Sequence, residues 1–114
     1  MYGARSQDEL YYHQEFTDMA AKHPNFTYVP ALSDEPADSG WTGARGFVNE
    51  AAKAHFNNNF SGQKAYLCGP PPMIDAVIST LMQGSLFERD IYTEKFISAV
   101  DAANTVRSPL FKKI

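Results

Sequence analysis

The sequence is poor in cysteine: among its 114 residues only Cys68 carries a thiol. One cysteine excludes a disulfide within the chain, and it cannot supply the group of thiolates that holds an iron–sulfur centre. The three histidines, His13, His23 and His55, show no metal-ligand spacing to one another or to Cys68. We therefore expect no metal site in this chain.

The sequence also lacks an excess of basic residues and any long apolar run. Ten Lys and Arg stand against 13 Asp and Glu, which gives a net charge of −3 and argues against a nucleic-acid or anionic-membrane partner. No apolar stretch approaches the roughly 18 residues that a membrane span needs, and no signal-peptide pattern stands at the start. We expect a soluble, cytoplasmic protein.

What is present is an ordinary globular composition, with 44% hydrophobic and 20% charged residues over about the length of one domain. Residues 6–9 form a capping-box pattern that predicts a helix from about Gln7 to Lys22. Further patterns predict strands at residues 26–32, 64–68 and 91–96 and helices at 47–56 and 73–81, with an irregular stretch at 33–46. This alternation predicts an α/β fold with a doubly wound parallel sheet over residues 1–97, followed by a weakly patterned C-terminal extension at 98–114.

A third deficit concerns glycine. Doubly wound nucleotide-binding domains begin with a strand and a Gly-rich turn that holds the pyrophosphate. Here the seven glycines are scattered, and only the last residues of a strand, at 2–5, precede the first helix pattern. We therefore expect an N-terminally truncated domain that lacks its first strand–turn–helix unit.

The most informative stretch surrounds the single thiol. An apolar run at residues 65–67 ends in Cys68, followed by Gly69-Pro70-Pro71 and then a helix pattern. Ligands of open α/β sheets bind at the carboxyl ends of the strands, so a thiol at this position is a candidate functional residue. The alternative is a buried cysteine that packs as a small hydrophobe.

Several short motifs together resemble one family. They are Tyr2-Gly3-Ala4-Arg5-Ser6, Ala31-Leu32-Ser33-Asp34, Trp41-Thr42-Gly43, Cys68-Gly69-Pro70-Pro71 with Met73-Ile74, and Glu94-Lys95-Phe96. With them the chain resembles the NAD-binding domain of the ferredoxin–NADP reductase superfamily over essentially its whole length. Within that superfamily it is most similar to the reductase components of multicomponent phenol hydroxylases.

The resemblance implies an oxidoreductase function. A hydride would pass from NADH to FAD, and electrons would continue through a [2Fe–2S] centre to the oxygenase component of an aromatic monooxygenase. FAD and [2Fe–2S] would belong to upstream domains, so we expect the fragment alone to be inactive. One alternative is the flavin subunit of the sodium-pumping NADH:quinone reductase, which shares several of these motifs. Another is a non-catalytic nucleotide-binding remnant.

The resemblance also implies roles around the thiol. Cys68 would lie beside the reacting edge of nicotinamide and position the ring rather than act as a nucleophile. Gly69 would let the backbone approach the dinucleotide, and Pro70 and Pro71 would stiffen the turn. Met73 would flank the nucleotide, although it could equally belong to the core.

Four further residues would meet the adenosine side of the cofactor. Arg5 would contact the ribose or a phosphate, unless it is a solvated arginine near Asp8 or Glu9. Ser33 and Asp34 stand where NADP-using relatives tend to have Ser-Arg, and an aspartate would repel a 2′-phosphate and accept from a free 2′-hydroxyl, which favours NADH over NADPH. Trp41 would stack on adenine, or else cap the core.

The last pair lies near the end of the domain. Phe96 would lie against the flavin ring, the alternative being an ordinary strand phenylalanine. Glu94 would hydrogen-bond near the junction of flavin and nicotinamide.

Overall fold

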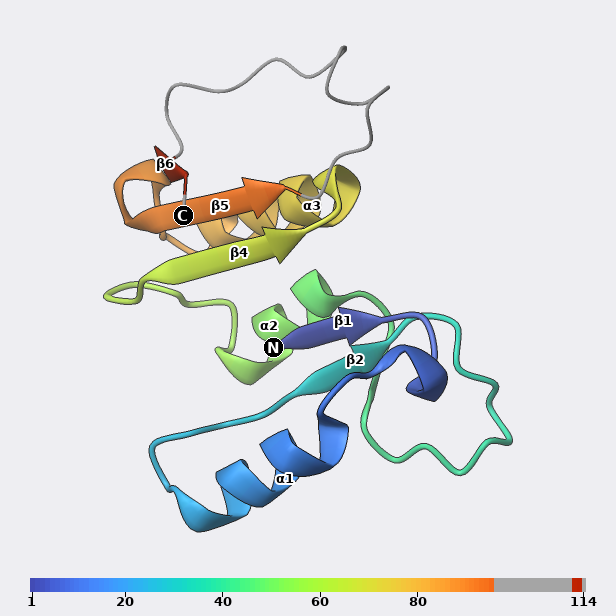
Figure 1. The fold of residues 1–114 in the computed structure, drawn as a ribbon. Coiled ribbons are helices and arrows are strands. Elements are labelled where there is room, and N and C mark those ends of the chain that lie inside the picture. The colour runs from blue at the N-terminus through green and yellow to red at the C-terminus, as the bar shows by residue number, and fades with distance from the viewer. Residues whose placement is uncertain (96–111, 114) are drawn as a thin grey trace. The chain divides into compact units, whose positions relative to one another are not determined.

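The computed structural model describes residues 1–95 and the backbone of residues 112–113 (Figure 1). The chain forms two compact units, residues 1–52 and 53–114, and each is described by itself. The expected Phe96 and nearly all of the expected extension at 98–114 lie outside the described residues.

The first unit is a parallel three-stranded sheet with one crossover helix. Strands β1 (Tyr2–Ala4), β2 (Pro30–Leu32) and β3 (Ala44–Arg45) lie side by side in the order β1-β2-β3. Helix α1 (His13–Lys22) connects the first two strands, and α2 (Val48–His55) follows the third. The buried apolar residues of this unit are Ala31, Leu32, Val48 and Ala52.

The second unit repeats the parallel arrangement. Strands β4 (Ala65–Gly69), β5 (Ile91–Lys95) and β6 (Lys112–Lys113) pair in that order, and α3 (Pro71–Gln83) connects the first two. Helix α3 packs against both β4 and β5. A short 3₁₀ turn, η2 (Glu88–Asp90), leads into β5. The buried apolar residues are Phe60, Ile74, Val77, Leu81, Leu86 and Ile91.

The parallel α/β class expected from the sequence is confirmed, since every strand pairing among the described residues is parallel. The predicted helices at 47–56 and 73–81 correspond to α2 and α3, and the strands at 64–68 and 91–96 to β4 and β5. Two short strands were not predicted: β3 lies inside the stretch at 33–46 that we expected to be irregular, and β6 lies inside the expected extension at 98–114. Each has two residues, which are too few to produce a period.

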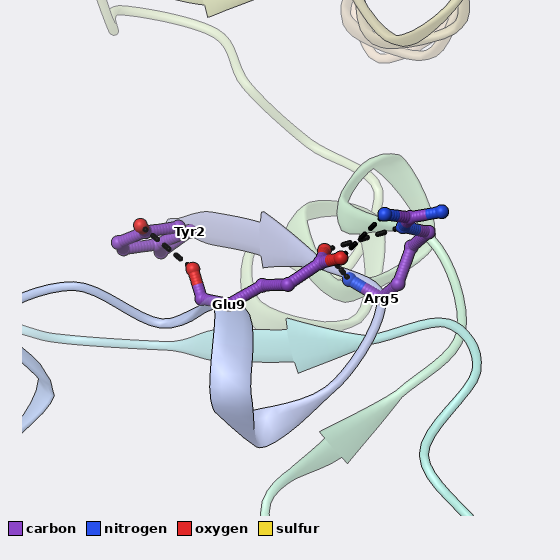
Figure 2. A network of polar contacts seen from close by, with 3 residues as sticks. All are labelled: Tyr2, Arg5 and Glu9. Carbon is purple, nitrogen blue, oxygen red and sulfur yellow. Dashed lines mark hydrogen bonds and ion pairs between the residues drawn. The ribbon is translucent and has the colours of Figure 1, made fainter.

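The predicted helix start at Gln7 is wrong. Residues Gln7–Glu9 form only a 3₁₀ turn, η1, and α1 begins six residues later, after Tyr12 in the left-handed conformation (φ 57°). No side-chain cap comes from Ser6. The Tyr2 hydroxyl donates to the carbonyl of Glu9 (3.4 Å) and accepts from the amide of Tyr11 (3.1 Å). These two backbone groups are thereby withdrawn from a continuous helix. Figure 2 shows the contact between Tyr2 and Glu9.

The predicted strand at 26–32 is shorter than expected, because only Pro30–Leu32 pair with β1. The residues before it face α1 instead: the rings of Phe26 and Tyr28 lie 6.5 and 5.4 Å from that of Phe16, between centroids. Aromatic residues favour strands in isolation, but here they form a cluster with the helix.

Candidate functional site

The thiol of Cys68 is exposed on the face of the β4–β5 pair that α3 leaves open. Side chains alternate along a strand, and Tyr66 and Cys68 are exposed whereas Leu67 between them is half-buried. Cys68 stands opposite Glu94 in the parallel register, and Tyr66 stands opposite Tyr92. The two tyrosine rings are stacked, with centroids 4.9 Å apart. Thiol, carboxylate and the ring pair therefore share one face at the carboxyl end of β4.

Gly69 makes the turn after β4 possible. It is buried at φ +154°, a conformation that L side chains rarely adopt. A Cβ atom at this position would overlap the terminal methyl group of Met73. The half-buried Met73 side chain thus folds back over the turn, and the backbone of Gly69 lies directly beneath it.

The start of α3 is made of prolines. Pro70 is the N-cap, and Pro71 and Pro72 occupy the first two helical positions. Because proline has no N–H, Met73 carries the first backbone N–H of the helix; the next, on Ile74, already bonds to the carbonyl of Pro70 (3.1 Å). A helix N-terminus normally binds phosphate through several such N–H groups. This turn therefore offers few free backbone N–H groups to a phosphate.

One ion pair fixes the opposite side of this edge. Lys95, which pairs in register with Gly69, bonds through Nζ to the carboxylate of Asp75 on α3 at 3.2 Å. The bond joins the end of β5 to the first turns of the helix. Sequence reasoning missed Asp75, because nothing in the local pattern links two residues 20 positions apart.

In the first unit, the carboxyl ends of β1 and β2 bring three of the predicted residues together. The amide of Ser33 donates to the carbonyl of Ala4 (3.0 Å), and that of Asp34 to the carbonyl of Arg5 (2.8 Å). The Asp34 side chain is exposed. Arg5 and Ser33-Asp34 therefore lie at one edge of the β1-β2-β3 sheet.

Arg5 forms an ion pair with Glu9. Its Nη2 lies 2.5 Å from Oε1 of Glu9, and its backbone N–H donates to Oε2 (3.3 Å) (Figure 2). The hydrogen bond between the two side chains, reinforced by their opposite charges, raises the pKa of Arg5 and lowers that of Glu9. Arg5 is paired with Glu9, and most of its side chain is exposed.

Trp41 is held within the 33–46 stretch. Its indole N–H donates to the carbonyl of Ala44 (3.0 Å), and its ring lies 5.8 Å from that of His13, between centroids. The side chain is half-buried. One side of the indole is therefore occupied by α1.

Two charged residues that the sequence did not single out organise the same stretch. The carboxylate of Glu35 accepts from the backbone N–H and the side-chain amide of Gln7 (2.9 and 2.6 Å). Arg45 donates to the carbonyls of Glu35, Pro36 and Trp41. No spacing rule connects these residues, so the sequence offered no signal for them.

The predicted site residues thus fall into two groups. The first unit holds Arg5, Ser33, Asp34 and Trp41, and the second holds Cys68, Gly69, Pro70, Pro71, Met73 and Glu94. Among the described residues, no group of three or more His, Cys, Asp or Glu is arranged to hold a metal ion. No helix in that part of the chain has the length and apolar character of a membrane span.

Comparisons with known proteins agree with this geometry. Residues 1–79 match the profile of the oxidoreductase NAD-binding domain family. The reductase component DmpP of phenol 2-monooxygenase from Pseudomonas sp. (strain CF600) is 61% identical over 98% of this chain and 32% of its own length. One subunit of the Na(+)-translocating NADH-quinone reductase of Haemophilus influenzae (strain PittEE) is 35% identical over 83% of this chain and 24% of its own length.

A solved structure shows the same fold. The cytochrome P450 reductase GcoB of Amycolatopsis aligns with a TM-score of 0.72 and 34% identity, over 82% of this chain and 27% of that one. The chain spans about a third of the length of the phenol 2-monooxygenase reductase and about a quarter of the other two proteins. Because the family profile covers more than half of the chain, this protein belongs to the oxidoreductase NAD-binding domain family.

Proposed function

We propose that this chain is the NADH-binding part of a flavoprotein reductase that serves an aromatic monooxygenase. Membership of the NAD-binding family supports the nucleotide, and the 61% identity to a phenol 2-monooxygenase reductase component supports the monooxygenase. The lower identity to the quinone reductase subunit, 35%, favours this assignment over the sodium-pumping alternative. An oxygenase component as partner and a cytoplasmic location belong to the same proposal.

The observation that carries the proposal is the edge formed by Cys68, Gly69 and Glu94. An exposed thiol and a carboxylate stand side by side on parallel strands, next to a turn whose backbone is covered by Met73. A small number of polar groups placed beside such a turn can fix the orientation of a nicotinamide ring. In this proposal Cys68 contacts the ring, Glu94 orients its polar substituent, and Pro70 and Pro71 keep the turn rigid.

The residues of the first unit support an NADH preference. Asp34 presents an exposed carboxylate at the edge of β2, where it accepts a hydrogen bond from a ribose hydroxyl and repels a phosphate. Arg5 and Ser33 flank it through backbone hydrogen bonds. The ribose contacts are proposed for the first unit and the nicotinamide contacts for the second.

FAD and a [2Fe–2S] centre are proposed for further domains of a longer protein, where they would supply acceptance of the hydride and its release as single electrons. The single thiol of this chain does not suit a cluster, which takes four ligands. The chain's own part is to bind NADH and to hold its ring in one orientation. Phe96, which lies outside the described residues, remains a predicted contact of the flavin ring.

The single cysteine allows a direct test. The rate at which a small disulfide reagent modifies Cys68 is measured in the 114-residue chain with and without NADH, and with ADP-ribose, which lacks nicotinamide. We expect NADH to slow the modification about tenfold and ADP-ribose to slow it much less. An equal rate with and without saturating NADH would overturn the nicotinamide assignment.

A matched control moves the thiol away from the site. In the double variant Cys68→Ser, Ser61→Cys the cysteine occupies an exposed position ahead of β4. NADH should leave its modification rate unchanged. If NADH also slowed the modification of this relocated thiol, the slower modification of Cys68 would come from an effect of NADH on the reagent and not from binding beside Cys68.

A further inference from the structure

The 33–46 stretch carries Asp34, and it is tied down at three points. The first is the carboxylate of Glu35, which accepts two hydrogen bonds from Gln7. The hydrogen bonds from the Gln7 side chain and backbone and from Ser39 lower the pKa of Glu35, because they favour its ionised form. The residue after Asp34 is therefore fixed to η1.

The second point is Arg45 at the other end of the loop. Arg45 pairs in register with Leu32, so its side chain begins beside the residue where β2 ends. Nη1 donates to the carbonyls of Glu35 (2.9 Å) and Pro36 (3.3 Å), and Nη2 donates to the carbonyl of Trp41 (3.1 Å). One guanidinium thus donates to three carbonyls of the loop from two separate nitrogens of a planar group, whereas a lysine would have to donate from the single Nζ atom.

The third point lies in the backbone of Asp34 itself. Its amide donates to the carbonyl of Arg5 at 2.8 Å, which continues the β1–β2 pairing by two residues beyond the strands. Both the amide of Asp34 and the residue after it are consequently held, while the Asp34 carboxylate is exposed at the edge.

We propose that Arg45, together with Glu35, is a positioning residue that holds the Asp34 carboxylate where it distinguishes a ribose 2′-hydroxyl from a 2′-phosphate. Neither residue contacts the nucleotide in this proposal, and both act through Asp34. Arg45 determines selectivity by geometry, because its own positive charge would by itself favour the phosphate. The inference rests on the proposed function, since it assumes that Asp34 meets the ribose.

The test uses the full 114-residue chain and two probes, ADP-ribose and 2′-phospho-ADP-ribose, with affinities measured by calorimetry. The variant Arg45→Lys keeps the charge and removes the planar group. We expect it to bind ADP-ribose about tenfold more weakly and the 2′-phosphorylated probe no more weakly than the unchanged chain. The selectivity ratio therefore falls, which a general loss of stability would not produce.

A second background separates positioning from direct contact. In Asp34→Asn chains, Arg45→Lys should have almost no further effect on either affinity, because the two residues act through one contact. Arg89→Lys is the matched control: it makes the same exchange on an exposed arginine of the second unit and should leave both affinities unchanged. Thermal unfolding of every variant confirms that each is folded.

The outcomes separate the two claims. If the unchanged chain does not bind ADP-ribose, the proposed function fails and this inference fails with it. If the unchanged chain binds ADP-ribose and Arg45→Lys retains the full selectivity, the inference alone is overturned. Equal effects of Arg45→Lys in the unchanged chain and in the Asp34→Asn chain would overturn it too, since Arg45 would then act independently of Asp34.

Discussion

At the scale of single residues, the thiol of Cys68 is available for contact because β4 alternates its side chains and α3 covers only one face. A buried cysteine, the alternative left open by the sequence, does not occur here, since Cys68 is exposed. Exposure alone assigns no role. Cys68 is a candidate contact because it stands opposite Glu94 and directly before the Gly69 turn.

We predict that Cys68→Ala, made in a longer protein that joins this chain to the proposed flavin domain, slows flavin reduction about tenfold to a hundredfold and changes the NADH dissociation constant little. The reason is that a positioning contact acts on the orientation of the ring more than on its binding. Stopped-flow absorbance measures both quantities. Equal losses in rate and affinity would identify Cys68 as an ordinary binding contact.

Glu35 provides a prediction about pH. Hydrogen bonds from Gln7 and Ser39 lower its pKa in the folded chain below the ordinary value of 4.5. The folded state therefore gains stability from this carboxylate above pH 4.5, and loses it as the pH falls through the lower, folded pKa. We expect the NMR shift of the Gln7 amide to follow this titration, with a midpoint below the ordinary value of 4.5.

The variant Glu35→Gln is the control for this titration. It removes the ionisable group and should remove that step from the Gln7 titration curve. A midpoint at or above 4.5 in the unchanged chain would show that the hydrogen bonds do not hold the carboxylate in its ionised form.

At the scale of elements, sequence reasoning succeeded where the determinants are local. The apolar residues of α3 recur at helical spacing, and prolines and Gly84 mark its two ends, so both its type and its approximate limits were predictable. Residues 64–68 and the Gly69 turn were predictable for the same reason. The position of Cys68 at the carboxyl end of a strand could therefore be predicted from the sequence.

Elements that depend on distant partners were not predictable. The start of α1 is decided by the hydroxyl of Tyr2, which takes backbone groups of Glu9 and Tyr11. The length of β2 is decided by how many residues β1 presents to it. The Arg45 and Lys95 contacts likewise join residues that no sequence period connects.

The end of α3 provides a test of packing. Gly84 is buried as the C-cap, and its carbonyl accepts from the amide of Phe60 (2.8 Å). A Cβ atom there would overlap the ring of Phe60, which is 1% exposed, and would lie 3.2 Å from the carbonyl oxygen of Asn58. We expect Gly84→Ala to lower the free energy of unfolding by about 1–3 kcal/mol.

Chemical denaturation measures this change. The control, Gln83→Ala, alters the exposed neighbour on the same helix and should change the stability by less than about 0.5 kcal/mol. If Gly84→Ala were as stable as the unchanged chain, the Phe60 ring would have room to move, contrary to its complete burial.

At the scale of the whole molecule, the crossover helices of the two units differ in how deeply their side chains are buried. Helix α3 buries Ile74, Val77 and Leu81, whereas α1 has no buried residue, although Leu32 on the neighbouring strand β2 is 1% exposed. The difference follows from α1, whose aromatic face meets a cluster of half-buried rings rather than a closed core.

We predict from this difference that the backbone amides of β4 and α3 exchange with solvent about tenfold or more slowly than those of α1 under native conditions. Amides open with free energies that follow the burial around them. Hydrogen exchange followed by mass spectrometry or NMR measures the rates. Equal protection in α1 and α3 would mean that the half-buried cluster stabilises the first unit as strongly as the closed core stabilises the second.

The setting of Trp41 has a practical consequence. It is the only tryptophan of the chain, and it lies in the loop that Arg45 holds, with its indole N–H on Ala44 and its ring near His13. Its intrinsic fluorescence therefore reports on this loop without any added label. A red shift of its emission would indicate that the indole has been released into water. The fluorescence of Trp41 therefore measures whether its side chain remains packed in this loop.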